Sequence, residues 1–244
     1  MQVDSEVLSV LSRATTNGTA LTLVGQLDRK LYERTNKVLE AAGGKWDRRA
    51  KAHVFADDAA TRMEQILLTG DIVIPKDEFN YFPTPPDVVD RLMELADVRP
   101  GMLVLEPSAG QGAIANACRT AGGEVTCIEL MPANAQALRD QRHSVSERDF
   151  LTMQPSPLMD RVVMNPPFAR QADIKHVLHA LRFLRDGGRL VSVMSASVTF
   201  RENTLTQDFR ALVSSRSGSI EELPEGAFKS SGTMVRTVIV TIPA

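Results

Sequence analysis

Asn165-Pro166-Pro167-Phe168 is a tetrapeptide whose residue types can do specific chemistry. It follows the apolar run Arg161–Met164, which is typical of a β-strand. The two prolines restrict the backbone, so the turn can present the Asn165 amide oxygen and a backbone carbonyl to one target. The ring of Phe168 offers a stacking face. The pattern favours a site that grips a planar group bearing an exocyclic NH2. A proline-rich strand-to-helix loop without chemistry is the alternative.

A second chemical segment lies between a predicted strand, Leu103–Leu105, and a predicted helix. It reads Glu106-Pro107-Ser108-Ala109-Gly110-Gln111-Gly112. Ligands of open α/β sheets bind at the carboxyl ends of strands, and glycines there allow close backbone approach. This glycine spacing also fits a dinucleotide site. However, the Glu106 carboxylate would repel a pyrophosphate and attract the amino group and sulfonium of S-adenosylmethionine (SAM). We therefore favour SAM over NAD.

Three further segments are candidates to complete a SAM site. Glu129, followed by Leu130, ends the next predicted strand and can accept hydrogen bonds from ribose hydroxyls. Asp149 and Phe150 end a third strand, where they can contact the amino group and the ring of adenine. Phe82 and Thr84 precede a predicted helix, and Thr84 can bind the methionine carboxylate together with backbone N–H groups. Each signal is weak alone, because solvated acids and helix N-caps produce the same patterns.

The elements that must position these residues alternate between strand and helix from Phe82 onward. Such alternation predicts a mostly parallel sheet covered on both faces, with a domain at residues 79–244. Within it we expect a helix over 173–184 ended by Gly187-Gly188, a short helix over 209–213 and a final strand over 235–242. Residues 1–78 predict a separate small α+β domain, with strands near 19–24 and 52–55 and helices near 29–42 and 57–68.

Composition narrows the function classes. The chain has 244 residues, 43% of them hydrophobic, and a formal net charge of -2, so any basic surface must be local. Cys118 and Cys127 lie in apolar segments, which predicts buried free thiols. His176 and His179 are three residues apart without cysteine partners, so we expect no metal site. No signal segment or membrane-length apolar run is present, and we expect a soluble cytoplasmic protein of a bacterium or a phage-infected cell.

Together the motifs resemble those of class I SAM-dependent amino-methyltransferases, in particular N6-adenine DNA methyltransferases of bacteriophages and restriction-modification systems. The resemblance covers roughly residues 80 to 242. Thr84-Pro85 matches the motif before the SAM loop, Glu106–Gly112 the SAM loop, Glu129 the ribose acid, Asp149-Phe150 the adenine-contact pair and Asn165–Phe168 the catalytic tetrapeptide. Phe228 falls where the family carries a second aromatic against the target base, and Lys229 follows it. The resemblance implies a Rossmann-like, doubly wound sheet of seven strands and SAM as cofactor.

The resemblance also implies a reaction, namely direct methyl transfer to adenine N6 of a flipped base in DNA. Two departures matter: Phe168 replaces a frequent tyrosine, and no large target-recognition domain follows it, so we expect relaxed or short sequence specificity. RNA adenine or guanine N-methyltransferases and protein glutamine methyltransferases use the same turn and are alternatives. A SAM- or DNA-binding decoy or regulator is the non-enzymatic alternative.

The chain has two candidate regions for contact with nucleic acid. The sharper one is Lys45-Trp46-Asp47-Arg48-Arg49-Ala50-Lys51, which combines phosphate-binding charge with the single tryptophan. The alternative is a solvated hairpin whose Trp46 anchors the core of the small domain. The second region combines the polar stretches Arg201–Thr204 and Lys229–Thr233.

Overall fold

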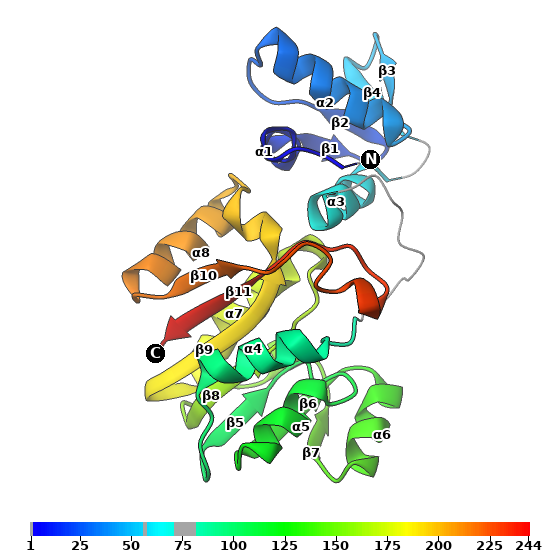
Figure 1. The fold of residues 1–244 in the computed structure, drawn as a ribbon. Helices are drawn as coiled ribbons and strands as arrows, with labels where there is room; N and C mark the ends of the chain where they lie inside the picture. The colour runs from blue at the N-terminus through cyan, green and yellow to red at the C-terminus, as the bar shows by residue number, and fades with distance from the viewer. Residues whose placement is uncertain (1, 56–57, 71–81) are drawn as a thin grey trace.

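Seven strands of the C-terminal part of the chain form one sheet, in the order β10-β11-β9-β8-β5-β6-β7 (Figure 1). The computed structural model describes residues 2–55, 58–70 and 82–244. Strands β5 to β9 pair in parallel, whereas β11 is antiparallel to both of its neighbours. The strands are β5 (Leu103–Glu106), β6 (Glu124–Glu129), β7 (Ser144–Glu147), β8 (Met159–Met164), β9 (Leu184–Ser195), β10 (Ser219–Glu222) and β11 (Thr237–Pro243).

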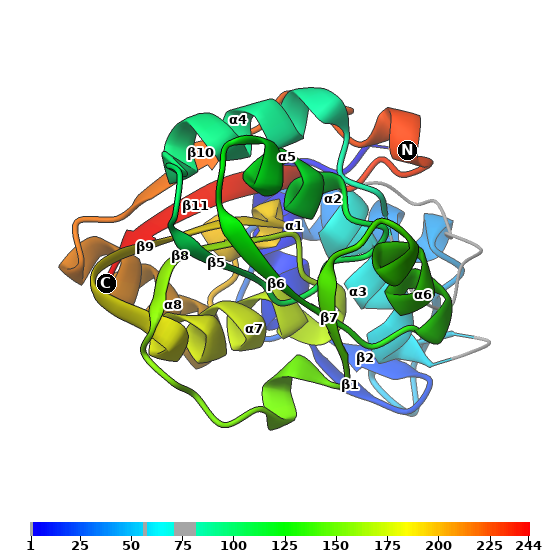
Figure 2. The same ribbon diagram turned by 90° about the horizontal axis from the view of Figure 1, so that it is seen from below.

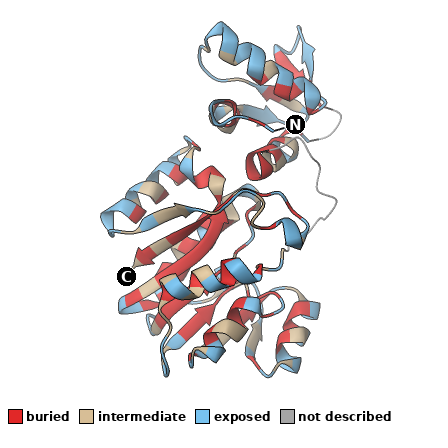
Figure 3. Cartoon of the chain, in the orientation of Figure 1, coloured by how far each residue is buried: buried red, intermediate tan, exposed pale blue. Residues whose placement is uncertain are grey.

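Helices cover both faces of this sheet, with α4 and α5 on one side and α7 and α8 on the other (Figure 2). The central strands are therefore buried on both faces, as the red strands of Figure 3 show. This burial is the reason that the C-terminal half of β8, Val162–Met164, is apolar throughout. The sheet confirms the predicted doubly wound α/β fold. The helices are α4 (Pro86–Ala96), α5 (Ala113–Thr120), α6 (Pro132–Asp140), α7 (Ala172–Ala180) and α8 (Thr204–Ser215).

The order of the strands reverses at β5. From β5 the chain passes outward to β6 and β7, and then returns to β8 on the other side of β5. The crevice at the carboxyl ends of β5 and β8 is thus the topological switch point, where ligands of such sheets bind. Glu106 ends β5, and Asn165 directly follows β8.

The N-terminal unit, residues 2–55 and 58–70, has its own antiparallel sheet in the order β1-β2-β4-β3. Its core gathers apolar side chains of all its helices, such as Leu11, Leu39 and Ile66. Aspartates begin its helices because their side chains accept backbone N–H groups of the first turn. The elements are α1 (Ser5–Arg13), β1 (Thr15–Asn17), β2 (Ala20–Thr22), α2 (Arg29–Ala41), β3 (Lys45–Asp47), β4 (Ala52–Val54) and α3 (Ala59–Thr69).

Helix α3 connects the two units. Leu68, near its end, packs in the core cluster of the large sheet, and the Leu68 carbonyl accepts the Arg236 N–H at 3.2 Å. Phe200, from the loop after β9, packs in turn against the N-terminal core. The predicted domain boundary at 78/79 lies outside the described residues.

Some expectations need correction. The helix expected over 173–184 ends at Ala180, and Gly187-Gly188 lie inside β9 instead of ending a helix. Gly187 has φ +75°, and the pairing of β8 with β9 shifts register between Met159 and Arg161, so the glycines accommodate an irregularity in the strand. The predicted short helix is longer, because the Asn203 side chain caps α8.

The two thiols are free and buried, as predicted. Burial raises the pKa of Cys127 to about 12, so this thiol stays protonated. Among the described residues, no helix combines the length and apolar character that a membrane span requires.

Candidate active site

A cavity of about 340 Å³ lies at the switch point of the large sheet. It brings together segments that are far apart in the sequence: the residues before α4, the loops after β5, β6, β7 and β8, and one residue of α7. Its lining consists of Phe82, Pro107, Ser108, Glu129, Leu130, Met131, Arg148, Asp149, Phe150, Leu151, Asn165, Pro166, Pro167, Phe168 and His176. A narrow extension adds Thr84, Glu106, Ala109, Gly110, Ala113 and Ile114. Most of the predicted cofactor residues therefore share one cavity.

The loop after β5 has a geometry that requires glycine. Gly112 has φ +90°, and a Cβ placed on it would lie 2.9 Å from Leu138 Cδ2. Gly110 has φ +53°, and its N–H donates to Glu129 Oε2 at 2.7 Å. Both residues use the left-handed region that favours glycine, and Gly112 begins α5 without a side-chain cap. The loop thus approaches the cavity as bare backbone at a helix N-terminus, although Gly112 itself does not line the cavity.

Glu129 holds two loops together. Its Oε1 accepts the Met131 N–H and its Oε2 accepts the Gly110 N–H, each at 2.7 Å. An ionised carboxylate has about four lone-pair sites, so two remain for ligand hydroxyls. The neighbouring Leu130 side chain is 65% exposed at the wall of the cavity and offers an apolar surface to a ring.

Glu106 is buried, and its Oε2 has no hydrogen-bond partner. Burial raises its pKa well above the ordinary carboxyl value; the nearby Glu129 adds to the rise and the Ala115 N–H opposes it. The protonated acid is therefore favoured in this environment. Burial thus disfavours the negative charge expected from the sequence, and a cationic group of a ligand would offset that penalty.

Asp149 and Phe150 form the far wall of the cavity. Asp149 Oδ1 accepts the Leu151 N–H at 2.9 Å and begins a short 3-10 helix, Phe150–Thr152. Phe150 is buried and contacts the rings of His176 and His179 with centroids 5.9 and 4.8 Å away. Burial lowers the pKa of both histidines, so they act as neutral packing groups.

Asn165 is held by groups that decide how its amide points. Its Nδ2 donates to Thr84 Oγ1 at 3.1 Å and to the Phe82 carbonyl at 3.4 Å. A backbone carbonyl can only accept, so the NH2 side of the amide must face Phe82. Asn165 Oδ1 is left buried without a partner. Thr84 Oγ1 accepts from Asn165 and keeps its own O–H to donate.

The two phenylalanines predicted to contact substrate differ. Phe168 lines the cavity, although it is only 5% exposed. Phe228 is fully buried in the core cluster with Leu92 and Ile239 and does not line the cavity. The predicted stacking of Phe228 on a base is therefore not supported, because no face of its ring is accessible. Lys229 is exposed in a loop next to the residues before α4, since the Ser231 hydroxyl of this loop donates to the Pro83 carbonyl at 2.6 Å.

Comparison with known proteins decides the family. The profile of the family described as "methyltransferase small domain" matches residues 90–217, which is more than half of the 244-residue chain. The chain belongs to this family. Its cofactor is SAM, and the methyltransferase match overturns the NAD alternative.

A sequence relative and two solved structures are similar to this methyltransferase chain. The type II methyltransferase M.CvrRI of Paramecium bursaria Chlorella virus XZ-6E is 30% identical over 138 residues, which are 48% of this chain and 36% of the relative. A modification subunit of a candidate type I restriction enzyme from Vibrio vulnificus YJ016 has a TM-score of 0.56 at 16% identity, over 69% of this chain and 45% of that chain. A candidate RNA methyltransferase from Pyrococcus horikoshii has a TM-score of 0.52 at 20% identity, over 70% and 89%.

The comparisons show the family and the fold of the chain. The chain spans 36% of the length of the curated relative it matches. The two structural likenesses show the fold, which is that of SAM-dependent methyltransferases. The resemblance to DNA methyltransferases drawn from the motifs is confirmed at the level of the sequence relative.

The basic segment of the N-terminal unit is a hairpin of this methyltransferase, β3–β4, and lies apart from the cavity. Figure 1 shows α3 between this hairpin and the large sheet. Trp46 is 49% exposed and contacts the His53 ring edge-on, with centroids 5.1 Å apart. It does not anchor the core, so that part of the alternative is wrong, whereas a solvated hairpin without a role in binding stays an alternative. The exposed basic side chains of the hairpin are Lys45, Arg48, Arg49 and Lys51.

One predicted nucleic-acid contact is contradicted. Arg201 is only 5% exposed, and its Nη2 forms an ion pair with Glu64 of α3 at 2.8 Å. It serves the contact between the units and cannot reach a phosphate. Met131, Arg148 and His176 line the cavity and were not predicted. The first two directly follow or precede predicted residues in the chain, whereas His176 comes from α7 and no local signal marks it.

Proposed function

We propose that the protein transfers a methyl group from SAM to the exocyclic N6 of adenine in DNA. The observation that supports this best is the buried, unpartnered Oδ1 of Asn165 at the edge of the cofactor cavity. A buried polar atom without a partner is costly, and in active sites such atoms await a ligand group. Because Phe82 and Thr84 hold the NH2 side of the amide, this acceptor is preorganised before substrate arrives.

In the proposed mechanism, the Asn165–Phe168 turn makes adenine N6, a poor nucleophile, more reactive. The lone pair of adenine N6 is delocalised into the ring. The two N6–H groups would donate hydrogen bonds to Asn165 Oδ1 and to the Pro166 carbonyl, which draws the nitrogen toward tetrahedral geometry and directs its lone pair along one line. SAM, when bound, would supply an electrophilic methyl group on a sulfonium: as the N–C bond forms, the S–C bond would break, S-adenosylhomocysteine would leave and one N6 proton would pass to solvent. The rate enhancement then comes from positioning and from fixed dipoles, without a covalent enzyme intermediate.

Access requires an extruded base. Asn165 is part-buried, and the cavity of about 340 Å³ is too narrow for a duplex, so an adenine in double-stranded DNA would have to be flipped out. Phe168 lines the same cavity and is the candidate stacking partner, a contact that contributes about 1–3 kcal/mol per base. Its small exposed fraction means that a flipped base would contact one edge or face of the ring at the cavity wall.

DNA is favoured over the alternative substrates by one finding. The sequence relative, at 30% identity, is a type II methyltransferase. The turn alone suits an RNA adenine, a guanine N2 or a glutamine amide equally, because each presents an NH2 beside a planar system. A decoy that only binds SAM or DNA would not need the two-point anchoring of the Asn165 amide.

The β3–β4 hairpin is the proposed backbone contact for DNA. Its lysines and arginines are exposed, and the half-exposed Trp46 can rest on sugar or base. Asp47 accepts the N–H groups of Arg49 and Ala50 at 2.7 and 2.9 Å, so the turn that displays the two arginines is ordered in advance. Contacts to the DNA backbone carry little information about base sequence, which fits the expected relaxed or short sequence specificity.

Product analysis tests the proposal. The purified protein is incubated with methyl-labelled SAM and, in separate reactions, with DNA, RNA and a protein extract. Each polymer is digested and its methylated unit is identified by mass spectrometry. The expected product is N6-methyldeoxyadenosine from DNA, absent with Asn165→Ala. Label confined to RNA, to guanine or to glutamine would replace the proposed substrate, and no label in any polymer would favour the decoy.

A further inference from the structure

The segment that directly follows the Asn165–Phe168 turn has an unusual backbone. Arg170 (φ 53°, ψ 34°) and Gln171 (φ 58°, ψ 33°) are two consecutive non-glycine residues in the left-handed region. L-residues avoid this region, and a pair of them persists only where surrounding contacts hold it. Only Ala169 separates the pair from Phe168, so the conformation of this segment determines how the turn enters α7.

Contacts within the large unit hold one half of this segment. Gln171 Oε1 accepts from Asn203 Nδ2 at 3.0 Å and from Thr206 Oγ1 at 2.8 Å, at the start of α8. Asp173 is buried, and its two oxygens accept the N–H groups of Ile174 and Ser195 at 3.0 Å. These bonds fix Gln171 and the start of α7, but they do not reach the backbone of Arg170.

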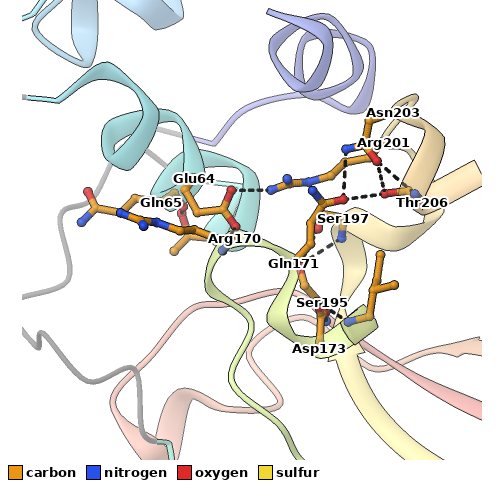
Figure 4. A network of polar contacts seen from close by, with 12 residues as sticks. Glu64, Gln65, Arg170, Gln171, Asp173, Ser195, Ser197, Arg201, Asn203 and Thr206 are labelled. Atoms are coloured by element: carbon orange, nitrogen blue, oxygen red, sulfur yellow. Dashed lines mark hydrogen bonds and ion pairs between the residues drawn. The ribbon is translucent and has the colours of Figure 1, made fainter. Parts of the chain in front are cut away.

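A side chain of the N-terminal unit holds the other half. Glu64 Oε1 accepts the Arg170 N–H at 2.8 Å, and Glu64 Oε2 accepts from Arg201 Nη2 at 2.8 Å (Figure 4). The side chains of Arg201 and Glu64 are 6% and 16% exposed, so solvent screens this ion pair weakly. One carboxylate of α3 thus bridges the segment after the turn and the loop after β9.

We propose that Glu64 is a positioning residue for methyl transfer, through which α3 holds the Asn165–Phe168 turn in its reactive geometry. The proposal rests on the proposed function. Without Glu64, the Arg170 N–H loses its acceptor, and the Arg201 guanidinium, whose Nε already lacks a partner, loses its counter-ion inside the protein. The left-handed pair can then relax, and the turn moves with it.

Replacing Glu64 should not affect the part of the cavity that binds the cofactor. The loops after β5 and β6 are held by Glu129 and by their own backbone bonds, and Glu64 does not line either part of the cavity. The proposal therefore predicts a loss in the rate of transfer with no loss in SAM affinity. A merely structural role of α3 would instead lower stability, SAM affinity and rate together.

The first experiment compares Glu64→Gln and Glu64→Ala in the full chain. Glutamine keeps one oxygen for Arg170 but removes the charge opposite Arg201, so its loss should be smaller. The single-turnover rate of Glu64→Ala should fall about 100-fold, which is the scale of an error of about 1 Å in positioning, while its SAM dissociation constant stays within about threefold. Glu33→Ala is the matched control, because Glu33 pairs with Arg29 on the exposed face of α2; its rate should not change.

The second experiment does not depend on activity. Amide hydrogen exchange of the cofactor-free protein should speed up at residues 169–173 in both Glu64 variants and remain unchanged in Glu33→Ala. If the wild type methylates no substrate, the proposed function fails, and the exchange data still decide whether Glu64 holds the segment. Wild-type exchange and rate in every Glu64 variant that folds would overturn the proposal, as would a parallel loss of rate and SAM affinity. If Glu64→Ala does not fold, the transfer rate and the hydrogen exchange are both measured on Glu64→Gln.

Discussion

Replacing Asn165 by alanine is the sharpest test of the proposed chemistry, because the structure indicates a large effect on rate and a small effect on stability. Removal of one preorganised electrostatic contact from a transition state typically costs about 100- to 1,000-fold in rate, or about 2.7–4 kcal/mol. Asn165→Ala removes such a contact at the proposed acceptor Oδ1. We therefore expect kcat to fall by at least about 100-fold.

The expected change in stability is small. The variant loses the hydrogen bonds from Nδ2 to Thr84 Oγ1 and to the Phe82 carbonyl, of which the second is long at 3.4 Å. Each is worth about 0.5–1.5 kcal/mol. It also removes the buried Oδ1 that lacks a partner, a group that costs about 1–3 kcal/mol. The two effects nearly cancel, so the melting temperature should move by only a few degrees.

The assay measures single-turnover methyl transfer from labelled SAM and, separately, the SAM dissociation constant by calorimetry. Asn36→Ala is a matched control, because Asn36 also bonds through both ends of its amide, to His53 and Glu40 at 2.7 Å, but lies in the N-terminal unit. Thr84→Val should show an intermediate rate, since the amide keeps one anchor. A rate for Asn165→Ala within tenfold of the wild type, at unchanged SAM affinity, would refute the role of Oδ1.

Three further predictions concern the cofactor and DNA. Asp149→Ala should weaken SAM binding about tenfold, the scale of one hydrogen bond to a charged group; an unchanged dissociation constant would count against the adenine contact. Burial raises the pKa of Glu106 above its unfolded value, so the cofactor-free protein should lose stability as pH rises through that raised pKa, while SAM affinity rises. Glu106→Gln should flatten both profiles in thermal melting and calorimetry, and a variant with the wild-type slopes would contradict this. Joint replacement of Arg48 and Arg49 by alanine should lower the slope of log affinity for DNA against log salt by about 2. Arg99→Ala is the control, because it removes an exposed arginine paired with Asp97, and it should leave that slope unchanged. An unchanged slope in the Arg48 and Arg49 double variant would show that the hairpin does not contact phosphates.

The sequence by itself determined the sheet and the edge at which ligands gather. Apolar periodicity is a local property, so strands such as β5 and β8 and the helices between them are readable from a few residues each. Because parallel strands present their carboxyl ends at one edge, motifs after separate strands were expected to meet, and Glu106 and Glu129 do line two neighbouring pockets that share Asn165. The exposure of Trp46 and the burial of Phe228 were not readable, since aromatic rings serve cores and sites equally well.

Tertiary structure alone decided how the chemical groups are held. The Phe82 carbonyl that orients the Asn165 amide lies 83 residues away in the chain, and the arginine that pairs with Glu64 lies 137 residues away. Such contacts depend on how helices and loops pack around the finished sheet, and no short stretch of sequence carries that information. The same packing converts Arg201 from an expected phosphate contact into a buried partner of Glu64, because a cation enclosed between two units is stable only beside an anion.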